Sequence, residues 1–241
     1  FMHMCFSKTP ALSPSGDCRP FSDQADGTLL GEGICMFALK RLEDAERDGD
    51  KVYALLRGLG ASSDGRAKSV YAPRSEGQAK ALARAYAHAG YTAETVELVE
   101  AHGTGTKAGD AAEFEGLRSY FQDGSEDRQW CGIGSIKSQI GHTKAAAGAA
   151  GLFKAVMALH QGVLPPTIKV DRPNPKLDIE NTPFYLNTRT RPWVRSSKHP
   201  RRAGVSSFGF GGSNFHLALE EYEGAGPRLR TPSHELLLLS A

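Results

Sequence analysis

Apolar and polar positions along the chain follow two periods, one typical of helices and one of strands. At residues 76–90, Ala79, Leu82, Ala83 and Tyr86 recur at helical spacing, and a glycine stands at the C-terminal end. The same reasoning predicts further helices at residues 41–48, 110–121 and 143–160. Apolar runs bounded by turn residues predict strands at residues 28–39, 51–59, 95–101, 131–136, 203–208 and 214–221. Strands and helices that alternate in this way are typical of an α/β layered domain.

Two of these segments carry unusual residues. The run at 28–39 passes through Gly31 and Gly33, so we expect a buried strand with close backbone contacts. The helix at 143–160 begins with alanine and glycine, whose small side chains favour close packing all round, between two layers. Beyond Tyr222 the sequence is linker-like, and residues 235–241 are compatible with a further strand.

Composition places the chain among ordinary folded domains. It has 241 residues, of which 40% are hydrophobic, and a formal net charge of +2, which suffices for a sizeable core. This near-neutral balance argues against a nucleic-acid-binding protein. No apolar segment approaches the length of a membrane span and no secretory leader is recognisable, so we expect a cytoplasmic protein with no membrane partner. The four cysteines lack C-x-x-C spacing, which argues against a zinc ribbon or a disulfide framework.

Glycine is in excess, with 27 residues, and its clusters mark three corners that each follow a predicted strand. His102 lies in HGTGT, His142 ends KSQIGH, and Phe210 lies in FGFGGSN. Ligands of α/β proteins usually bind at strand ends, and two histidines on adjacent corners of one sheet can converge on one pocket. Two neutral imidazole N–H groups aimed at one carbonyl oxygen would stabilise an enolate. A helix N-terminus after His142 would favour its neutral form.

Each of these groups also has a plainer interpretation. A structural hydrogen bond explains either histidine alone, and Lys137, judged by its position, is better read as a solvated loop lysine, although it could tune the local field. Asp110 and Glu113 have the D-x-x-E spacing of a helix capping box, and we interpret them as structural. The turn at Phe210 fits either a backbone oxyanion donor or a tight hairpin. The histidines show no i, i+4 pairing and no cysteine at ligand spacing, so we expect no metal site.

A nucleophile for acyl chemistry is missing from this pattern. The sequence G-x-S-x-G is absent. No cysteine stands on a strand-to-helix elbow, where a nucleophile would be held and activated. We therefore interpret the four cysteines as structural: Cys5, Cys18, Cys35 and Cys131.

Four blocks follow one another along the chain. They are DCRPFSDQADGTLLGEG at residues 17–33, VEAHGTGT at 99–106, GSIKSQIGHTKAAAG at 134–148 and GVSSFGFGGSNFHLALEEY at 204–222. Their order and spacing resemble the β-ketoacyl synthase (ketosynthase) family. The resemblance implies a thiolase-like αβαβα fold of two similar halves. Residues 1–50 would end the first half, residues 51–222 would form most of the second, and residues 223–241 would be a linker toward a following domain.

The resemblance also implies roles for individual residues. In this family two histidines assist decarboxylation of a malonyl thioester and stabilise the enolate that attacks an acyl-cysteine, and these correspond to His102 and His142. The active-site lysine of the family corresponds to Lys137. The threonines that contact the phosphopantetheine arm correspond to Thr104 and Thr106. The gating aromatic corresponds to Phe210, whose N–H would complete the oxyanion hole.

The implied partners are those of a multidomain synthase. They are acyl carrier protein with its phosphopantetheine, malonyl and acyl thioesters, a second copy of the chain and other domains of the same synthase; no cofactor is bound directly. The acyl-accepting cysteine of the family would lie upstream of Phe1. Many modular polyketide synthases have Pro-Leu after HGTGT and a glutamate two residues after the second histidine. Here Lys107-Ala108 and Lys144 stand at these positions, which resembles the iterative synthases that make polyunsaturated fatty acids, or the related glycolipid and enediyne types.

Two other functions are compatible with the family. The chain could belong to a non-catalytic partner that shapes the acyl tunnel of an active ketosynthase, as chain-length factors do, although the retained His102, Lys137 and His142 argue against this. A thiolase-type enzyme without decarboxylation is disfavoured, because thiolases pair one histidine with a second cysteine and this sequence has a second histidine in that role.

Overall fold

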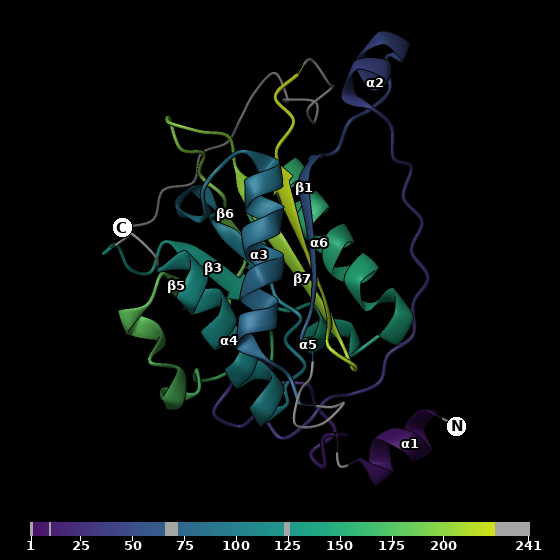
Figure 1. Cartoon of the computed structure of the whole chain (residues 1–241), viewed down its shortest axis with the longest axis vertical. Helices are drawn as coiled ribbons and strands as arrows, with labels where there is room; N and C mark the ends of the chain where they lie inside the picture. Colours follow the sequence, from purple (N-terminus) through teal and green to yellow (C-terminus); the bar gives the residue numbers. More distant parts are fainter. Residues whose placement is uncertain (1, 10, 66–71, 123–125, 225–241) are drawn as a thin grey trace, which may run out of the picture.

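The computed structural model describes residues 2–9, 11–65, 72–122 and 126–224. Its centre is a six-stranded mixed sheet in the order β1-β8-β7-β2-β3-β5 (Figure 1). Pairing is antiparallel between β1 and β8 and between β8 and β7, and parallel from β7 through β2 and β3 to β5. The strands are β1 (Leu55–Ser63), β2 (Leu98–Glu100), β3 (Cys131–Gly134), β5 (Phe184–Leu186), β7 (Arg202–Gly209) and β8 (Ser213–Glu220); β4 (Val163–Leu164) and β6 (Arg191–Pro192) form a separate antiparallel pair.

Helices cover both faces of the sheet, as the α/β prediction requires (Figure 1). Helices α3 (Ser75–Ala89) and α4 (Lys107–Phe121) pack on one face, and α6 (Ala147–Gln161) packs on the other. Helix α3 approaches β1 closely, because a Cβ added at Gly60 would collide with the carbonyl oxygen of Ala81. The described helices also include α1 (Met2–Lys8), α2 (Leu42–Asp48), α5 (Lys137–Ile140) and the 3-10 turns η1 (Ala93–Thr95), η2 (Lys144–Ala146), η3 (Pro175–Leu177) and η4 (Ile179–Asn181).

The core has two parts because successive side chains of a strand point to opposite faces. In β2, Leu98 joins the apolar cluster under α6, whereas Val99 joins the cluster under α3 and α4. Tyr86 of α3 and Phe121 of α4 are two of the large residues in the cluster under α3 and α4, and their ring centroids lie 5.9 Å apart. The sheet is thus buried on both sides at β2, the strand that leads to His102.

The predicted buried strand at residues 28–39 is wrong. This segment contains no strand, and its pairing is limited to isolated bridges at Thr28 and Leu30. The side chains of Ile34 and Met36 are 93% and 92% exposed. An apolar run becomes a buried strand only when neighbouring strands pair with it, and no described strand lies beside this one.

Other predicted helices and strands are present but begin or end at different residues. Strand β1 begins at Leu55 rather than at residue 51, and α4 begins at Lys107 rather than at residue 110. The helix predicted at 143–160 starts as the 3-10 turn η2 before α6 begins, and the exposed side chain of Phe153 shows that α6 is covered on one face, not all round. The possible strand at 235–241 and most of the predicted linker at 223–241 lie outside the described residues. Among the described helices, none is both long and apolar enough to cross a membrane.

Candidate active site

The three glycine-rich corners meet at one edge of the sheet, as predicted. Strands β2, β3 and β7 are parallel neighbours, so their carboxyl ends point to the same edge. The ring centroids of His102 and His142 lie 5.3 Å apart, with the ring planes nearly perpendicular at 84°. The ring of Phe208, at the end of β7, lies 6.1 Å from the His102 ring. Two imidazoles and an aromatic side chain from three strand ends therefore lie next to one another.

A cavity of about 690 Å³ opens at this edge. Both histidines line it, together with Thr104, Thr106 and Phe210. Its remaining wall is largely apolar and includes Met2, Phe6, Ala11, Pro73 and Phe208. Five of the residues predicted to carry function thus share one cavity, whereas Lys137, Asp110 and Glu113 support it from inside the protein or from its wall.

Glu113 holds the backbone on which His102 stands. Its carboxylate accepts hydrogen bonds from the N–H of His102 and the N–H of Gly103, both at 2.7 Å. Burial raises the pKa of Glu113, against the effect of these two donors. The geometry favours the ionised form as the acceptor, because a carboxylate can serve both N–H groups at once.

Asp110 ties the next part of the same loop to the N-terminal segment. Its carboxylate accepts from the N–H of Phe21 at 2.7 Å and from the N–H of Gly105 at 3.1 Å. The predicted capping box is therefore wrong. The helix begins three residues earlier, with Thr106 as its N-cap, and the side chain of Thr106 accepts from the N–H of Gly109 at 3.3 Å. Both acidic residues instead accept from loop N–H groups.

Lys137 is buried rather than solvated, with a side chain only 3% exposed, so the reading based on its position is wrong. Its ammonium donates to the backbone carbonyl oxygen of His102. Burial lowers the pKa of Lys137, and the nearby Glu100 and Glu113 carboxylates oppose that shift. The side chain of Lys137 thus contacts the backbone of the His102 loop, and its charge acts on the two imidazoles.

The environment keeps both imidazoles neutral. Burial first, and then the Lys137 ammonium, lower the pKa of His142 to about 4. Burial, followed by the charge of Lys137, also holds the pKa of His102 well below its ordinary value. The Nδ1 atom of His142 accepts a hydrogen bond from the N–H of Lys144 at 3.0 Å, so the proton of the neutral ring is on Nε2. Burial and the charge of Lys137 thus both favour the neutral state. The Nδ1 atom of His102 is buried and has no hydrogen-bond partner among the described residues.

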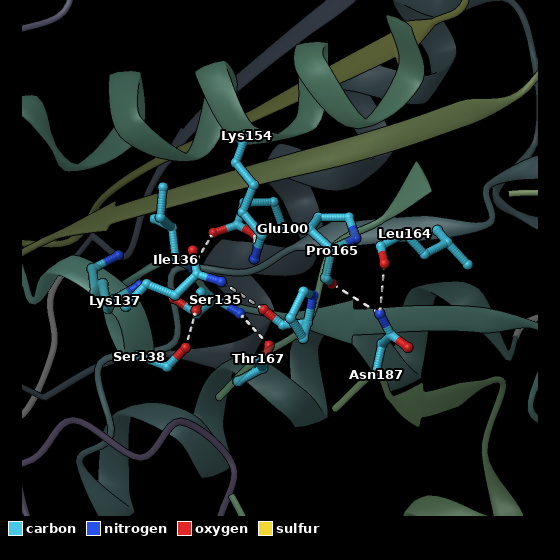
Figure 2. Close-up of polar contacts among 12 residues, drawn as sticks. Glu100, Ser135, Ile136, Lys137, Ser138, Lys154, Leu164, Pro165, Thr167 and Asn187 are labelled. Carbon is cyan, nitrogen blue, oxygen red and sulfur yellow. Dashed lines mark hydrogen bonds and ion pairs between the residues drawn. The ribbon is translucent and has the colours of Figure 1, made fainter. Parts of the chain in front are cut away.

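A buried polar network supports the turn that carries Lys137 (Figure 2). Glu100, at the end of β2, forms an ion pair with Lys154 of α6 at 2.8 Å, and both side chains are buried. The same carboxylate accepts from the N–H of Ile136 at 2.6 Å. The hydroxyl of Thr167 accepts from the N–H of Ser135 at 3.0 Å (Figure 2). The turn between β3 and α5 is therefore held by side chains of two other segments.

The threonines and the Phe210 turn complete the cavity. The hydroxyls of Thr104 and Thr106 lie 2.8 Å apart and share a hydrogen bond. The side chain of Phe210 is 63% exposed, at the tip of the hairpin between β7 and β8. Asn214 anchors this hairpin, because its amide donates to the buried carboxylate of Asp64 at 2.7 Å. Phe210 thus lies on a turn that is fixed at its base and exposed at its tip.

Comparison with protein families covers nearly the whole chain. Residues 53–171 match the β-ketoacyl synthase C-terminal domain, residues 173–241 match the ketoacyl-synthetase C-terminal extension, and residues 1–45 match the β-ketoacyl synthase N-terminal domain. The chain belongs to the β-ketoacyl synthase family. The predicted α/β fold class and the predicted family are therefore confirmed.

Similar proteins are parts of large synthases. A polyunsaturated fatty acid synthase of Thraustochytrium sp. is 48% identical over 227 residues, which cover 92% of this chain and 8% of that protein. Polyketide synthase PksL of Bacillus subtilis is 42% identical over 223 residues, which cover 92% of this chain and 5% of that protein. The ketosynthase segment therefore spans a small part of the length of these relatives.

Solved ketosynthases have the same arrangement of elements. The ketosynthase from module 6 of the bacillaene synthase of Bacillus subtilis 168 matches with a TM-score of 0.89 and 41% identity, over 92% of this chain and 40% of that one. An oxazolomycin ketosynthase domain of Streptomyces albus matches with a TM-score of 0.88 and 37% identity, over 98% of this chain and 41% of that one. The chain spans about two fifths of these solved ketosynthases.

Several residues of this ketosynthase site escape reasoning from the sequence. The prediction selected Phe210 from the glycine-rich motif and passed over Phe208, although the Phe208 ring lies beside His102. Glu100 and Lys154 lie far apart in the sequence, and no local sequence pattern predicts their ion pair. The one available signal was a charged residue inside each of two apolar elements, since charged side chains are rarely buried unless they are paired.

Proposed function

We propose that the chain is part of a β-ketoacyl-[acyl carrier protein] synthase that catalyses decarboxylative Claisen condensation of acyl and malonyl thioesters. The observation that carries this proposal is the pair of neutral imidazoles, His102 and His142, which meet at one cavity. A neutral imidazole has one N–H to donate, and two such donors at one thioester oxygen match the charge that develops on an enolate. This makes the enzyme an acyltransferase.

The reaction has two steps at this site. Loss of CO₂ from the malonyl thioester leaves its electron pair on the α-carbon, and the resulting enolate oxygen accepts hydrogen bonds from His102 and His142. The α-carbon then attacks the carbonyl carbon of an acyl-cysteine thioester, the new carbon–carbon bond forms, and the cysteine thiolate leaves. A proton on either imidazole would alter this electrostatic balance, and the lowered pKa values of both rings prevent its uptake at neutral pH. Lys137 contributes to that lowering by its charge.

The remaining predicted residues receive roles at the cavity. Thr104 and Thr106 would contact the phosphopantetheine arm of acyl carrier protein, and their adjacent hydroxyls suit the amide groups of such an arm. Phe210 would gate the cavity from its exposed turn, and its N–H would complete the oxyanion hole for the acyl-cysteine. The apolar wall of the cavity suits an acyl chain.

We further propose that residues 1–50 end the first half of a thiolase-like domain and that residues 51–222 form most of the second. The family matches at residues 1–45 and 53–171 support this division. The nucleophilic cysteine would precede Phe1, and the domain containing both that cysteine and this chain is called the complete domain below. We propose that the complete domain works as a homodimer in the cytoplasm within an iterative multidomain synthase. A non-catalytic, chain-length-factor-like role is not favoured, because the histidine pair is intact.

Substitution of the histidines in the complete domain tests the proposed function. His142→Ala and His102→Ala should each lower CO₂ release from malonyl-acyl carrier protein at least a hundredfold, because each removes one donor to the enolate. His88→Ala, which changes an exposed histidine on α3, is the matched control and should retain the activity. Full decarboxylation and condensation by His142→Ala would overturn the assignment.

A further inference from the structure

One segment of the chain contacts both histidine corners. Residues 18–31, called the strap here, run along the edge of the molecule below α4 and α5 before the chain rises to α2 (Figure 1). The strap contains part of the run that was predicted to be a buried strand. It is instead an irregular segment bonded to two loops that are distant from it in the sequence.

Three hydrogen bonds join the strap to the His102 corner. The N–H of Gly27 donates to the carbonyl oxygen of Gly105 at 3.0 Å. The thiol of Cys18 donates to the carbonyl oxygen of Thr104 at 3.2 Å. The third is the bond from the N–H of Phe21 to Asp110 described above. The loop that follows His102 is therefore bonded to the strap.

Backbone pairing joins the other end of the strap to the His142 corner. The N–H of His142 donates to the carbonyl oxygen of Leu29 at 2.6 Å, and the N–H of Gly31 donates to the carbonyl oxygen of His142 at 3.0 Å. His142 itself is thus bonded on both sides of its α-carbon. The approach is very close, because a Cβ added at Gly31 would collide with the backbone carbonyl oxygen of Ile140.

We propose that the strap sets the spacing of the two catalytic imidazoles, and that Gly31 is the positioning residue at its contact with His142. The inference rests on the proposed function, since spacing matters only if both rings serve one substrate oxygen. A displacement of about 1 Å at a catalytic group lowers the rate by up to about a hundredfold. Gly31 does not line the cavity and acts through the His142 backbone alone.

Two alanine substitutions in the strap region provide a matched test in the complete domain. Gly31→Ala forces the strap away from the His142 turn. Gly33→Ala makes the same change two residues later, where an added Cβ would meet the side chain of Thr143 at 3.3 Å and no backbone atom within 4 Å. Both replace glycine by alanine, so their effects on the unfolded chain are alike. The backbone torsion of neither glycine lies in the left-handed region.

The rate constant and the Michaelis constant separate positioning from general damage. For malonyl-acyl carrier protein decarboxylation, we expect Gly31→Ala to lower kcat by about tenfold to a hundredfold with KM changed by less than about threefold. Gly33→Ala should stay within about twofold of the unaltered domain in both constants. A folded Gly31→Ala domain with unaltered kcat would overturn the role of the strap and leave the proposed function intact. The role of the strap would also be overturned if the two histidine variants lost decarboxylation while both glycine variants kept it, and the proposed function would then stand.

Hydrogen exchange on the unaltered domain covers the case in which Gly31→Ala does not fold. The amides of Gly27, Gly31 and His142 should be protected and should exchange with one common opening free energy, because the strap holds both corners together. Exchange of the Gly31 and His142 amides at the rate of an open loop would overturn the inference. An unaltered domain that releases no CO₂ would instead overturn the proposed function on which the inference rests.

Discussion

The two histidine corners hold chemically equivalent rings by different means. At His102 the backbone is fixed by buried side-chain charges: Glu113 accepts two loop N–H groups, and the Lys137 ammonium donates to the carbonyl oxygen. At His142 the backbone is fixed by other backbone, through the strap, and the ring by the N–H of Lys144. The His102 corner is therefore sensitive to changes of charge, whereas the His142 corner is sensitive to changes of shape.

This difference also affects how each ring is tuned. The charged groups around His102 act on one another, since the carboxylates of Glu113 and Asp110 oppose the effect of burial on the pKa of Lys137. Removing one of them would leave the others buried and uncompensated, which is costly. At His142 a backbone donor, the N–H of Lys144, selects the tautomer. Substitutions at the two corners should therefore produce distinct patterns of loss.

The largest effect should follow from Glu113→Ala in the complete domain. It leaves the N–H groups of His102 and Gly103 buried without their acceptor, and each buried unsatisfied donor costs about 1–3 kcal/mol. We therefore expect the free energy of unfolding of Glu113→Ala, measured in urea, to fall by about this amount for each of the two donors. Decarboxylation should be lost as well. Glu115→Ala removes an exposed carboxylate from the same helix and should change that free energy by less than about 0.5 kcal/mol. Equal stabilities of the two variants would show that Glu113 does not hold the loop.

A second test concerns the buried pair of Glu100 and Lys154, which joins the His102 strand to the turn on the way to His142. Lys154→Met leaves a buried carboxylate unpaired, and breaking such a pair from one side costs about 3–5 kcal/mol. The double variant Glu100→Gln/Lys154→Met should recover most of that loss. The amide oxygen of the new glutamine can still accept from the N–H of Ile136. Additive losses in this double-mutant cycle would contradict a direct ion pair.

The His142 ring should titrate far below an ordinary histidine, whose pKa is about 6.5. With the pKa of His142 near 4, nitrogen NMR of the labelled domain should show it as the neutral Nε2–H tautomer down to about pH 5. The unfolded chain takes up a proton between about pH 6.5 and 4 that folded His142 does not. The contribution of this residue to stability is therefore complete above pH 6.5 and is lost as the pH falls toward 4. Burial raises the pKa of Asp110 to about 7, so the contribution of that residue to stability changes with pH in the opposite direction. The NMR signal of the His142 ring, rather than overall stability, is therefore the decisive measurement. A titration midpoint near pH 6.5 would show that neither burial nor the charge of Lys137 lowers the pKa of this ring.

The meeting of the two histidines was predictable, but the means of holding them was not. Each histidine follows a strand in a repeated strand-helix pattern, and parallel neighbours end at one edge, so local periodicity was sufficient. The spacing of Asp110 and Glu113 indicated a capping box, yet both carboxylates bind a loop, because tertiary donors outcompete a local cap. The apolar run through Ile34 was read as a buried strand, since its composition cannot reveal whether a partner strand lies beside it. Contacts between distant segments leave no periodic signal in a sequence.

The smallest effect should come from Cys18, which belongs to the strap and not to the chemistry. Its thiol is 0% exposed and donates to the Thr104 carbonyl oxygen, and burial raises its pKa to about 11. A buried thiol in this state is a poor nucleophile, since the thiolate is the reactive form. Cys18→Ala should lower the free energy of unfolding by about 1 kcal/mol. Cys18→Ser should lower it less, because the hydroxyl can donate in place of the thiol. Both variants should retain acyl transfer, measured with a labelled acyl thioester. Loss of acyl transfer in Cys18→Ala with the fold intact would place the nucleophile in this chain, and it would make the His102 corner a site of covalent chemistry rather than of support.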